Sequence, residues 1–276
     1  MKLAPALQSL LYTAVLLTGA LGSPVWASEA PVPYDLAKFR PVLDDSKLQA
    51  PTSSPAKIEQ GDFAGQSNQY LFLDETGQHL IFTVTGDSKR SELRQLSGDW
   101  DTSTPTPQRL IARLKVFVPE TPQLEQFTFM QIHDKKNGNH GLNKPLLRLT
   151  WRQSRGGKTD HLWAAIRTPK TTSQPISLKN LDSEWVDLGP RPKGFFDAEI
   201  VVQNGQMKVI LNGRTKVNKD VNYWNGLNNY FKAGVYNQDP GTSQVAFETL
   251  RYADSDDAAG GPPAKAAEAV RTDEPE

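Results

Sequence analysis

The chain contains no cysteine among its 276 residues. This absence excludes disulfides, thiol catalysis and cysteine metal sites. A protein of this length can still bury a core large enough to be stable without disulfides. Histidine is also scarce, and the four histidines form neither an HxH nor an HExxH pattern. The sequence therefore argues against a catalytic zinc site, and we expect no metal ligands.

The N-terminal segment is typical of a secretory signal. Lys2 precedes an apolar run over residues 10–21 that contains Thr and Gly and is short for a bilayer span. The sequence VWA then ends at Ala27, with small residues where signal peptidase cuts. We predict a signal peptide over residues 1–27 and a secreted or periplasmic protein that leaves the membrane once the signal is removed. The alternative is an N-terminal membrane anchor.

The C-terminal segment 254–276 contains one large apolar residue, Val270, among Ala, Pro, Gly and acidic side chains. Such a segment cannot bury enough apolar surface to offset the entropy lost on ordering. We therefore predict a disordered acidic tail. The remaining stretch, 28–253, holds 28 basic and 24 acidic residues, a net charge of +4. This excess suits an anionic ligand, although it serves solubility equally well.

Short alternating segments dominate residues 28–253, and no stretch sustains a long amphipathic helical period. A Glu-Thr-Gly turn signal interrupts the first segment, and Asn204-Gly205 is a hairpin signal in the last. These features predict an all-β fold, a jelly-roll sandwich of two antiparallel sheets. The Pro-rich lead-in before Gln69 is expected to be extended, with one short helical turn. The predicted strand segments are 69–84, 109–118, 126–133, 145–153, 161–167 and 197–217.

The first polar strand is KRSELRQL, over residues 89–96. Alternation along a strand places Arg90, Glu92 and Arg94 on one face. Two arginines flanking a glutamate can form a solvated salt-bridge ladder. They can also form a fork that binds a sugar carboxylate, because a planar guanidinium matches a carboxylate in a bidentate way.

The second polar strand is FTFMQIHD, in which Gln131 and His133 share the parity of Phe127 and Phe129. We therefore expect the glutamine and histidine to project together, on the same face as the two aromatic rings. The alternative for a single histidine is a purely structural role.

The third polar strand is YFKAGVYNQ, over residues 230–238. Its even positions form a polar face that holds Tyr230, Lys232, Tyr236 and Gln238, while its odd positions suit a core. Gly234 lies on the polar face and is expected to leave room for a ligand. The physical pattern alone predicts a polar binding face and does not distinguish the two tyrosines.

Together and in this order, RSELR, QIH and YFKAGVYNQ resemble the three signature strands of the alginate lyases of polysaccharide lyase family seven. The resemblance extends from about Tyr34 to Tyr252. It implies a jelly roll with a substrate groove along its concave sheet, and cleavage of alginate by β-elimination without a cofactor. The isoleucine in QIH is associated in the family with guluronate-containing blocks.

The resemblance also implies roles for single residues. The catalytic set would be Arg90, Gln131, His133 and Tyr236, with Arg94 as the alternative to Arg90. Arginine and glutamine would neutralise the uronate carboxylate, and Tyr236 would be the acid. His133 would be the base for guluronate, whereas Tyr236 would serve as both base and acid for mannuronate. The substrate-binding set would be Glu92, Arg94, Tyr230, Lys232 and Gln238.

Three other functions remain open on the sequence. A hydrolase needs paired carboxylates, and the best same-face pair is Asp197 and Glu199, which we expect to be a solvated strand face. A non-catalytic module for anionic polysaccharides and a lyase acting on another polyuronate, such as glucuronan, are the others. We expect a monomer whose partner is alginate or a related anionic polysaccharide, and no nucleic-acid partner.

Overall fold

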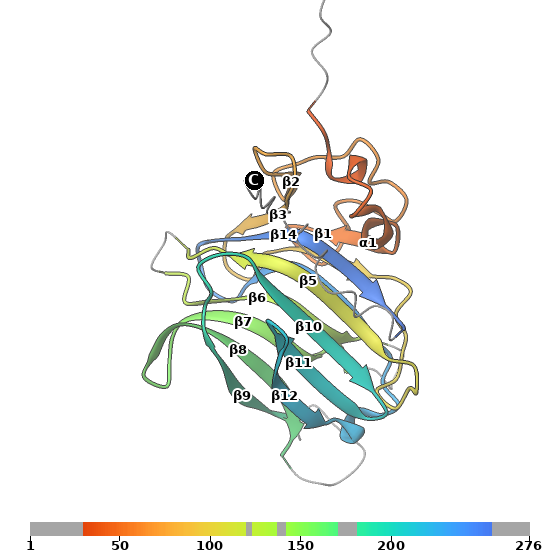
Figure 1. Cartoon of the computed structure of the whole chain (residues 1–276), viewed down its shortest axis with the longest axis vertical. Coiled ribbons are helices and arrows are strands. Elements are labelled where there is room, and N and C mark those ends of the chain that lie inside the picture. Colours follow the sequence, from red (N-terminus) through yellow and green to blue (C-terminus); the bar gives the residue numbers. More distant parts are fainter. Residues whose placement is uncertain (1–29, 120–122, 137–141, 171–180, 256–276) are drawn as a thin grey trace, which may run out of the picture. The chain divides into compact units, whose positions relative to one another are not determined.

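Two antiparallel sheets of seven strands each form the fold (Figure 1). The computed structural model describes residues 30–119, 123–136, 142–170 and 181–255. The first sheet has the order β1-β4-β13-β6-β7-β8-β9, and the second has the order β12-β11-β10-β5-β14-β3-β2. The prediction of an all-β jelly roll is confirmed.

The first sheet consists of β1 (Ser46–Gln49), β4 (Arg90–Gln95), β6 (Gln126–Asp134), β7 (Pro145–Arg155), β8 (Lys158–Pro169), β9 (Leu181–Pro190) and β13 (Asn229–Asn237). The second sheet consists of β2 (Leu71–Leu73), β3 (Leu80–Thr85), β5 (Gln108–Val116), β10 (Phe196–Gln203), β11 (Gln206–Leu211), β12 (Arg214–Asp220) and β14 (Thr242–Ala253). The helical elements among the described residues are η1 (Pro33–Asp35), α1 (Arg40–Asp44) and η3 (Asn222–Trp224).

The strands begin and end where the sequence carries its turn signals. The backbone N–H of Gly77 donates to the carbonyl of Asp74 at 2.8 Å and closes the turn between β2 and β3. Asn204 and Gly205 join β10 to β11 with φ values of 49° and 71°. A tight hairpin needs positive φ at both positions, which Asn and Gly adopt readily. Both predicted turns are confirmed.

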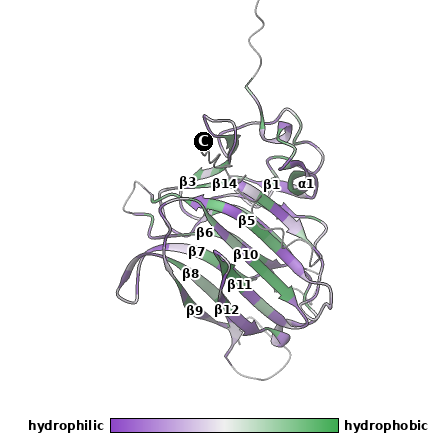
Figure 2. Cartoon of the chain, in the orientation of Figure 1, coloured by the Kyte–Doolittle hydropathy of each residue, from purple (hydrophilic) through white to green (hydrophobic). Residues whose placement is uncertain are grey.

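The core lies between the sheets and consists of the inward-facing side chains of both. Phe129 of β6 meets Phe196 of β10 edge to face, with their ring centroids 6.5 Å apart. Along β5, partly exposed positions alternate with buried ones from Arg109 to Val116, and the colour of its ribbon changes along the strand in Figure 2. Each large apolar side chain buried in this way contributes roughly 1.5–3 kcal/mol to folding.

The lead-in contains more structure than the sequence predicted. The single helical turn is present as α1, but β1 follows it and pairs with β4, from Ser46 opposite Gln95 to Gln49 opposite Glu92. Strands β9 and β14 also lie outside the predicted segments. Strand β1 is only four residues long, too short for a recognisable alternation.

The prediction for the β6 face was wrong for its aromatic residues. Phe127 and Phe129 are buried in the core, whereas Gln131 and His133 line a cavity on the opposite face. The pairing of β6 with β7 shifts between Thr128 and Met130, so that β6 carries one extra residue. Such a β-bulge reverses the parity of the residues beyond it.

The predicted signal peptide over residues 1–27 lies outside the described residues, as does the predicted tail from residue 256 onward. Asp254 and Ser255 follow directly after β14. Within the described ranges, no helix combines the length and the apolar character that crossing a membrane requires.

Candidate active site

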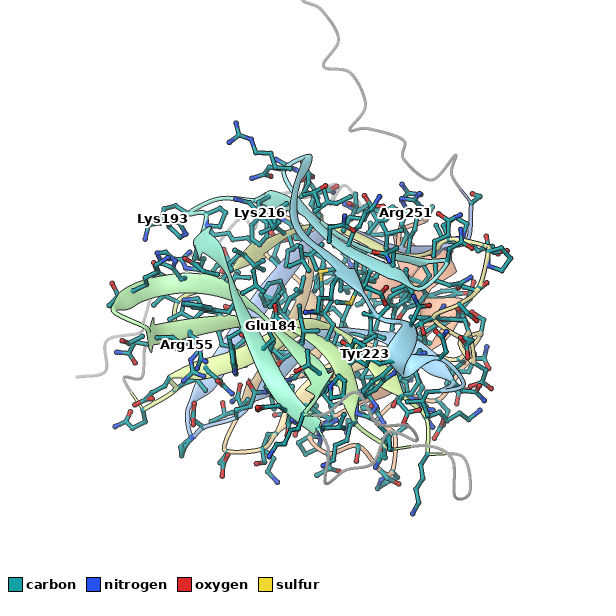
Figure 3. All side chains as sticks on the ribbon, turned by 90° about the horizontal axis from the view of Figure 1, so that it is seen from below. Arg155, Glu184, Lys193, Lys216, Tyr223 and Arg251 are labelled. Carbon is teal, nitrogen blue, oxygen red and sulfur yellow. The ribbon has the colours of Figure 1, made fainter. Side chains whose placement is uncertain are left out.

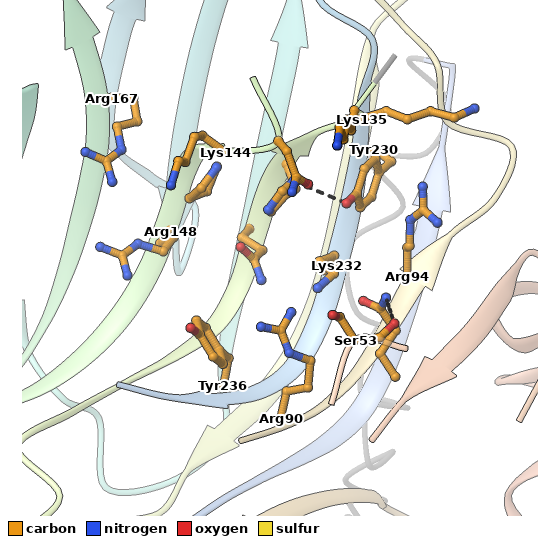
Figure 4. Close-up of a pocket in the computed structure, with 16 residues that line it drawn as sticks. Ser53, Arg90, Arg94, Lys135, Lys144, Arg148, Arg167, Tyr230, Lys232 and Tyr236 are labelled. Atoms are coloured by element: carbon orange, nitrogen blue, oxygen red, sulfur yellow. Dashed lines mark hydrogen bonds between the residues drawn. The ribbon is translucent and has the colours of Figure 1, made fainter. Parts of the chain in front are cut away.

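A cavity of about 600 Å³ opens on the middle of the first sheet (Figure 4). Sixteen described residues line this cavity. Half of them are Arg or Lys, and none of them is Asp or Glu. The lining residues are Gln49, Ser53, Arg90, Arg94, Gln131, His133, Lys135, Lys136, Asn143, Lys144, Pro145, Arg148, Arg167, Tyr230, Lys232 and Tyr236. Such a site favours an anionic ligand.

The sheet order brings the three polar motifs together. Strand β13 lies between β4 and β6, so all three motifs occupy adjacent strands. Tyr236 is opposite Arg90, and Lys232 is opposite both Arg94 and Gln131. Residues opposite each other share a face of the sheet. The cavity therefore collects all four predicted catalytic side chains, Arg90, Gln131, His133 and Tyr236.

Glu92 lies beneath the cavity floor, and its side chain is only 2% exposed. Its carboxylate accepts a hydrogen bond from Lys232 Nζ at 2.8 Å and one from the side-chain amide of Gln131. Arg90 Nη1 is 3.4 Å from the same carboxylate. A solvated ladder is therefore wrong for this strand, because the central carboxylate is buried among protein donors. A direct contact between Glu92 and substrate stays a prediction, and these contacts favour a positioning role instead.

Each of the two arginines of the first motif stacks on a tyrosine of the third. The Arg90 guanidinium carbon is 4.3 Å from the ring centroid of Tyr236, and that of Arg94 is 4.3 Å from the ring centroid of Tyr230. Stacking of this kind orients the guanidinium while leaving its edge free to bind a ligand. The geometry places both arginines on the cavity wall.

His133 is neutral in this environment. Burial, followed by the charge of Lys232, lowers the pKa of His133 to about 3. Its Nδ1 lies 2.7 Å from the backbone carbonyl of Asp134, which fixes the proton on Nδ1. Nε2 therefore carries the lone pair, and the imidazole is in its unprotonated, base form at neutral pH.

The surroundings of the two tyrosines differ. Tyr230 is 7% exposed, and its hydroxyl lies 3.2 Å from His133 Nδ1. Burial raises the pKa of Tyr230. Tyr236 is less buried and lines the cavity beside Arg90 and Arg148 (Figure 4). The structure therefore makes Tyr236 the more accessible phenol, a distinction that alternation along the strand did not provide.

Lys232 also lines the cavity, but its side chain is 2% exposed and its Nζ is bound to Glu92. Burial lowers the pKa of Lys232 to about 8, and the neighbouring Glu92 opposes this shift. These contacts do not allow Lys232 to extend toward a distant substrate carboxylate. Its ammonium can act only on a group placed directly over the floor.

Gln238 is not one of the described residues that line the cavity. Its side-chain amide donates to Thr128 Oγ1 at 3.1 Å and to the backbone carbonyl of Tyr236 at 2.9 Å. These bonds hold the backbone that carries Tyr236. The predicted substrate contact of Gln238 stays a prediction that this placement does not favour.

The expectation that Gly234 leaves room for a ligand was wrong. A Cβ at this position would lie 2.1 Å from the backbone oxygen of Ser91 and 2.8 Å from the Cα of Glu92. Gly234 therefore permits the close approach of β13 to β4. Its φ of 139° is also one that glycine adopts readily and other residues rarely do.

The two carboxylates considered for a hydrolase lie outside the cavity. Asp197 and Glu199 belong to β10 of the second sheet, where they pair with Arg113 at 3.2 Å and with Arg109 at 2.5 Å. Neither lines the cavity. The predicted solvated strand face fits Asp197, whose side chain is 47% exposed, better than Glu199, whose side chain is 20% exposed.

Sequence reasoning missed several lining residues. Gln49 and Ser53 come from the lead-in, which carries no polar motif. Arg167 ends the segment HLWAAIR, where parity with Ala165 could have placed it on the cavity face, because Ala165 is opposite Arg148. Among the described residues, no three His, Asp or Glu side chains lie close enough to hold a metal ion.

Comparison with known proteins identifies the family. The sequence profile described as "Alginate lyase" matches residues 42–254. An alginate lyase from Photobacterium sp. (strain ATCC 43367) is 32% identical over 249 residues, which cover 80% of this chain and 87% of the relative.

Solved structures agree. The alginate lyase AlyC3 superposes with a TM-score of 0.71 at 28% identity, covering 80% of this chain and 94% of that chain. The complex of AlyC3 with dimannuronate gives the same TM-score at 27% identity, covering 80% and 93% of the two chains. Alginate lyase PA1167 from Pseudomonas aeruginosa shares the fold, with a TM-score of 0.58 at 21% identity over 77% of this chain and 99% of that chain. The chain belongs to the alginate lyase family, of the type of polysaccharide lyase family seven.

Proposed function

We propose that this protein cleaves alginate by β-elimination at the uronate C5 and the C4–O bond. The observation that carries the proposal is the composition of the cavity. It holds the neutral imidazole of His133 and the accessible phenol of Tyr236, and its described lining contains many Arg and Lys side chains but no Asp or Glu. The dimannuronate complex of AlyC3 supports alginate as the substrate class.

The reaction first requires that the uronate carboxylate be neutralised, because removal of the C5 proton pushes further negative charge onto that group. Arg90 or Arg94, together with the amide of Gln131, supplies the donors. Gln131 gives one amide hydrogen to Glu92, which leaves the second for the substrate. Loss of one preorganised donor of this kind typically costs about 3 kcal/mol of transition-state stabilisation.

Proton transfer completes the elimination. The base removes the C5 proton, the C4–C5 double bond forms as the C4–O bond breaks, and the acid protonates the departing oxygen. For guluronate, where the two groups lie on opposite sides, His133 Nε2 is the base and Tyr236 is the acid. For mannuronate, where they lie on the same side, Tyr236 serves in both roles.

The test is the ultraviolet absorbance of unsaturated sugar ends formed from polymannuronate, polyguluronate and mixed alginate. We expect product from the wild type, with guluronate-containing blocks favoured, and a loss of at least about 100-fold in Tyr236→Phe. We expect His133→Asn to impair guluronate cleavage more than mannuronate cleavage. Equal losses would contradict the division of roles, and near-normal turnover in Tyr236→Phe would remove Tyr236 as the acid. Alginate binding without product would instead indicate a binding module.

We also propose that the protein is exported and that residues 1–27 are removed. The support is the signal-like sequence that ends at Ala27. N-terminal sequencing of the protein recovered from its native host should begin at Ser28. Recovery of an intact N-terminus in the membrane fraction would favour the anchor.

A further inference from the structure

The cavity contains a second group of basic side chains, away from the three motifs. Arg148 of β7 and Arg167 of β8 lie on the same side of the cavity (Figure 4). Arg148 is directly opposite Ala165, so Arg167 is its diagonal neighbour on the adjacent strand. Diagonal neighbours have backbones about 7–8 Å apart, within the reach of long side chains. The two guanidinium groups can therefore meet on one ligand.

Neither arginine has a salt bridge to an acidic residue in the described part of the chain. The two nearest segments in sequence that the structure does not describe, 137–141 and 171–180, contain no Asp or Glu. Burial, followed by the like charge of Arg167, lowers the pKa of Arg148, which places the two positive charges close enough to repel each other. Two neighbouring guanidinium groups without a salt bridge to a described acidic residue favour the binding of an anion.

Arg167 is held in place by its neighbours. Its Nη1 donates to Ser183 Oγ at 3.0 Å. The hydroxyl of Tyr223, labelled in Figure 3, donates to the backbone carbonyl of Arg167 at 2.7 Å. A guanidinium fixed before the ligand arrives loses less side-chain entropy on binding.

The position of Arg148 identifies the ligand. Arg148 is directly opposite Gln131, which faces the carboxylate of the reacting sugar in the proposed mechanism. Adjacent strands are about 4.8 Å apart, so the arginine pair lies just beyond the reacting sugar along the sheet. We propose that Arg148 and Arg167 together bind the carboxylate of the uronate next to the one that is cleaved. This inference rests on the proposed function.

The site would make the enzyme recognise two successive charged sugars. A bidentate guanidinium recognises the planar carboxylate rather than the sugar hydroxyls. The pair therefore contributes to binding of the polymer, whereas Gln131 and Tyr236 act on the reacting sugar. Loss of either arginine should raise KM and leave kcat nearly unchanged, because the interaction is equally strong before and during the reaction.

The test compares Arg148→Gln, Arg167→Gln and the double variant with the wild type. The matched control is Arg214→Gln, which removes an exposed arginine of β12 in the second sheet. We expect a rise of about tenfold in the KM for alginate in each single variant, since a charge-assisted hydrogen bond contributes enough for this. The double variant should lose little more than either single variant, because both arginines hold one carboxylate.

A second measurement does not depend on catalysis. Electrophoresis through gels that contain alginate should show retarded migration of the wild type and of Arg214→Gln, and less retardation of the three cavity variants. Gels that contain dextran, a neutral polymer, should show no difference. If the wild type were retarded and formed no unsaturated product, the proposed function would fail while the binding site remained.

Three outcomes would overturn the inference. A fall in kcat with unchanged KM would mean that Arg148 acts on the neighbouring Tyr236 instead. Fully additive losses in the double variant would show two separate contacts rather than one shared carboxylate. Unchanged KM and unchanged retardation in all three variants would show that the pair binds nothing in alginate.

Discussion

Glu92 is the residue on which the geometry of the floor depends. In the described part of the chain, its carboxylate forms a salt bridge with Lys232 and accepts a hydrogen bond from the side-chain amide of Gln131. The residue lies between two arginines in the sequence, where a surface ion-pair ladder is an equally reasonable prediction. Burial cannot be deduced from the strand alone, since it depends on β1 and β13, which flank β4.

We predict that Glu92→Gln destabilises the fold by about 3 kcal/mol, because it leaves the ammonium of Lys232 buried and unpaired. Chemical denaturation measures this loss. Adding Lys232→Met should recover a large part of it, since the second change removes the unpaired charge. An unchanged denaturation midpoint in Glu92→Gln would contradict the buried ion pair.

His133 should make the protein less stable in acid. Its folded pKa of about 3 lies below the unfolded value of 6.5, so the unfolded state binds more protons between these pH values. The stabilising effect is complete above pH 6.5 and is lost as the pH falls toward 3, by at most about 1.4 kcal/mol per pH unit. Denaturation curves of the wild type and His133→Asn at several pH values measure this contribution. A constant stability difference between the two proteins would refute it.

At the scale of the element, alternation predicted which strands carry the site but not every face. On β13, Phe231, Ala233 and Val235 enter the core as predicted, and Lys232 and Tyr236 face the cavity. On β6 the extra residue near Phe129 reverses the pattern. A bulge is fixed by the pairing of neighbouring strands, so a single strand's sequence does not reveal it.

Gly234 offers a test of the contact between β13 and β4. We expect Gly234→Ala to destabilise the fold by several kcal/mol, because the new Cβ would clash with the backbone of Ser91 and the φ would be strained. Gly194→Ala is the control, since a Cβ there meets nothing within 4 Å and its φ is outside the positive range. Denaturation of both variants gives the comparison. Similar denaturation midpoints for the two variants would mean that β13 can move away from β4 at this position without loss of stability.

At the scale of the whole molecule, the net charge gives little guidance to the site. The excess over residues 28–253 is only four positive charges, yet eight cations line one cavity. Many of the acidic residues instead pair elsewhere, as Asp197 and Glu248 do with Arg113 on the second sheet. The fold thus separates charges that the sequence interleaves, and the three motifs predicted only part of the basic lining.

This separation predicts a strong effect of salt on alginate binding. Raising NaCl from about 0.1 M to about 1 M shortens the screening length from roughly 10 Å to roughly 3 Å. The KM for alginate should then rise several-fold, while kcat changes little because the reacting groups are in direct contact. Steady-state kinetics across this range measures both. A KM independent of salt would argue against binding through the basic lining.

The placement of the reacting groups on β4, β6 and β13 has a consequence for how the enzyme can diversify. These three strands are adjacent in the first sheet, whereas Lys136, Asn143 and Lys144 come from the connection between β6 and β7. The proposed proton-transfer groups and this part of the basic lining are thus encoded in different parts of the chain. We expect substitutions at Lys136, Asn143 and Lys144 to change how tightly alginate binds, while the proposed proton-transfer groups stay in place on their strands.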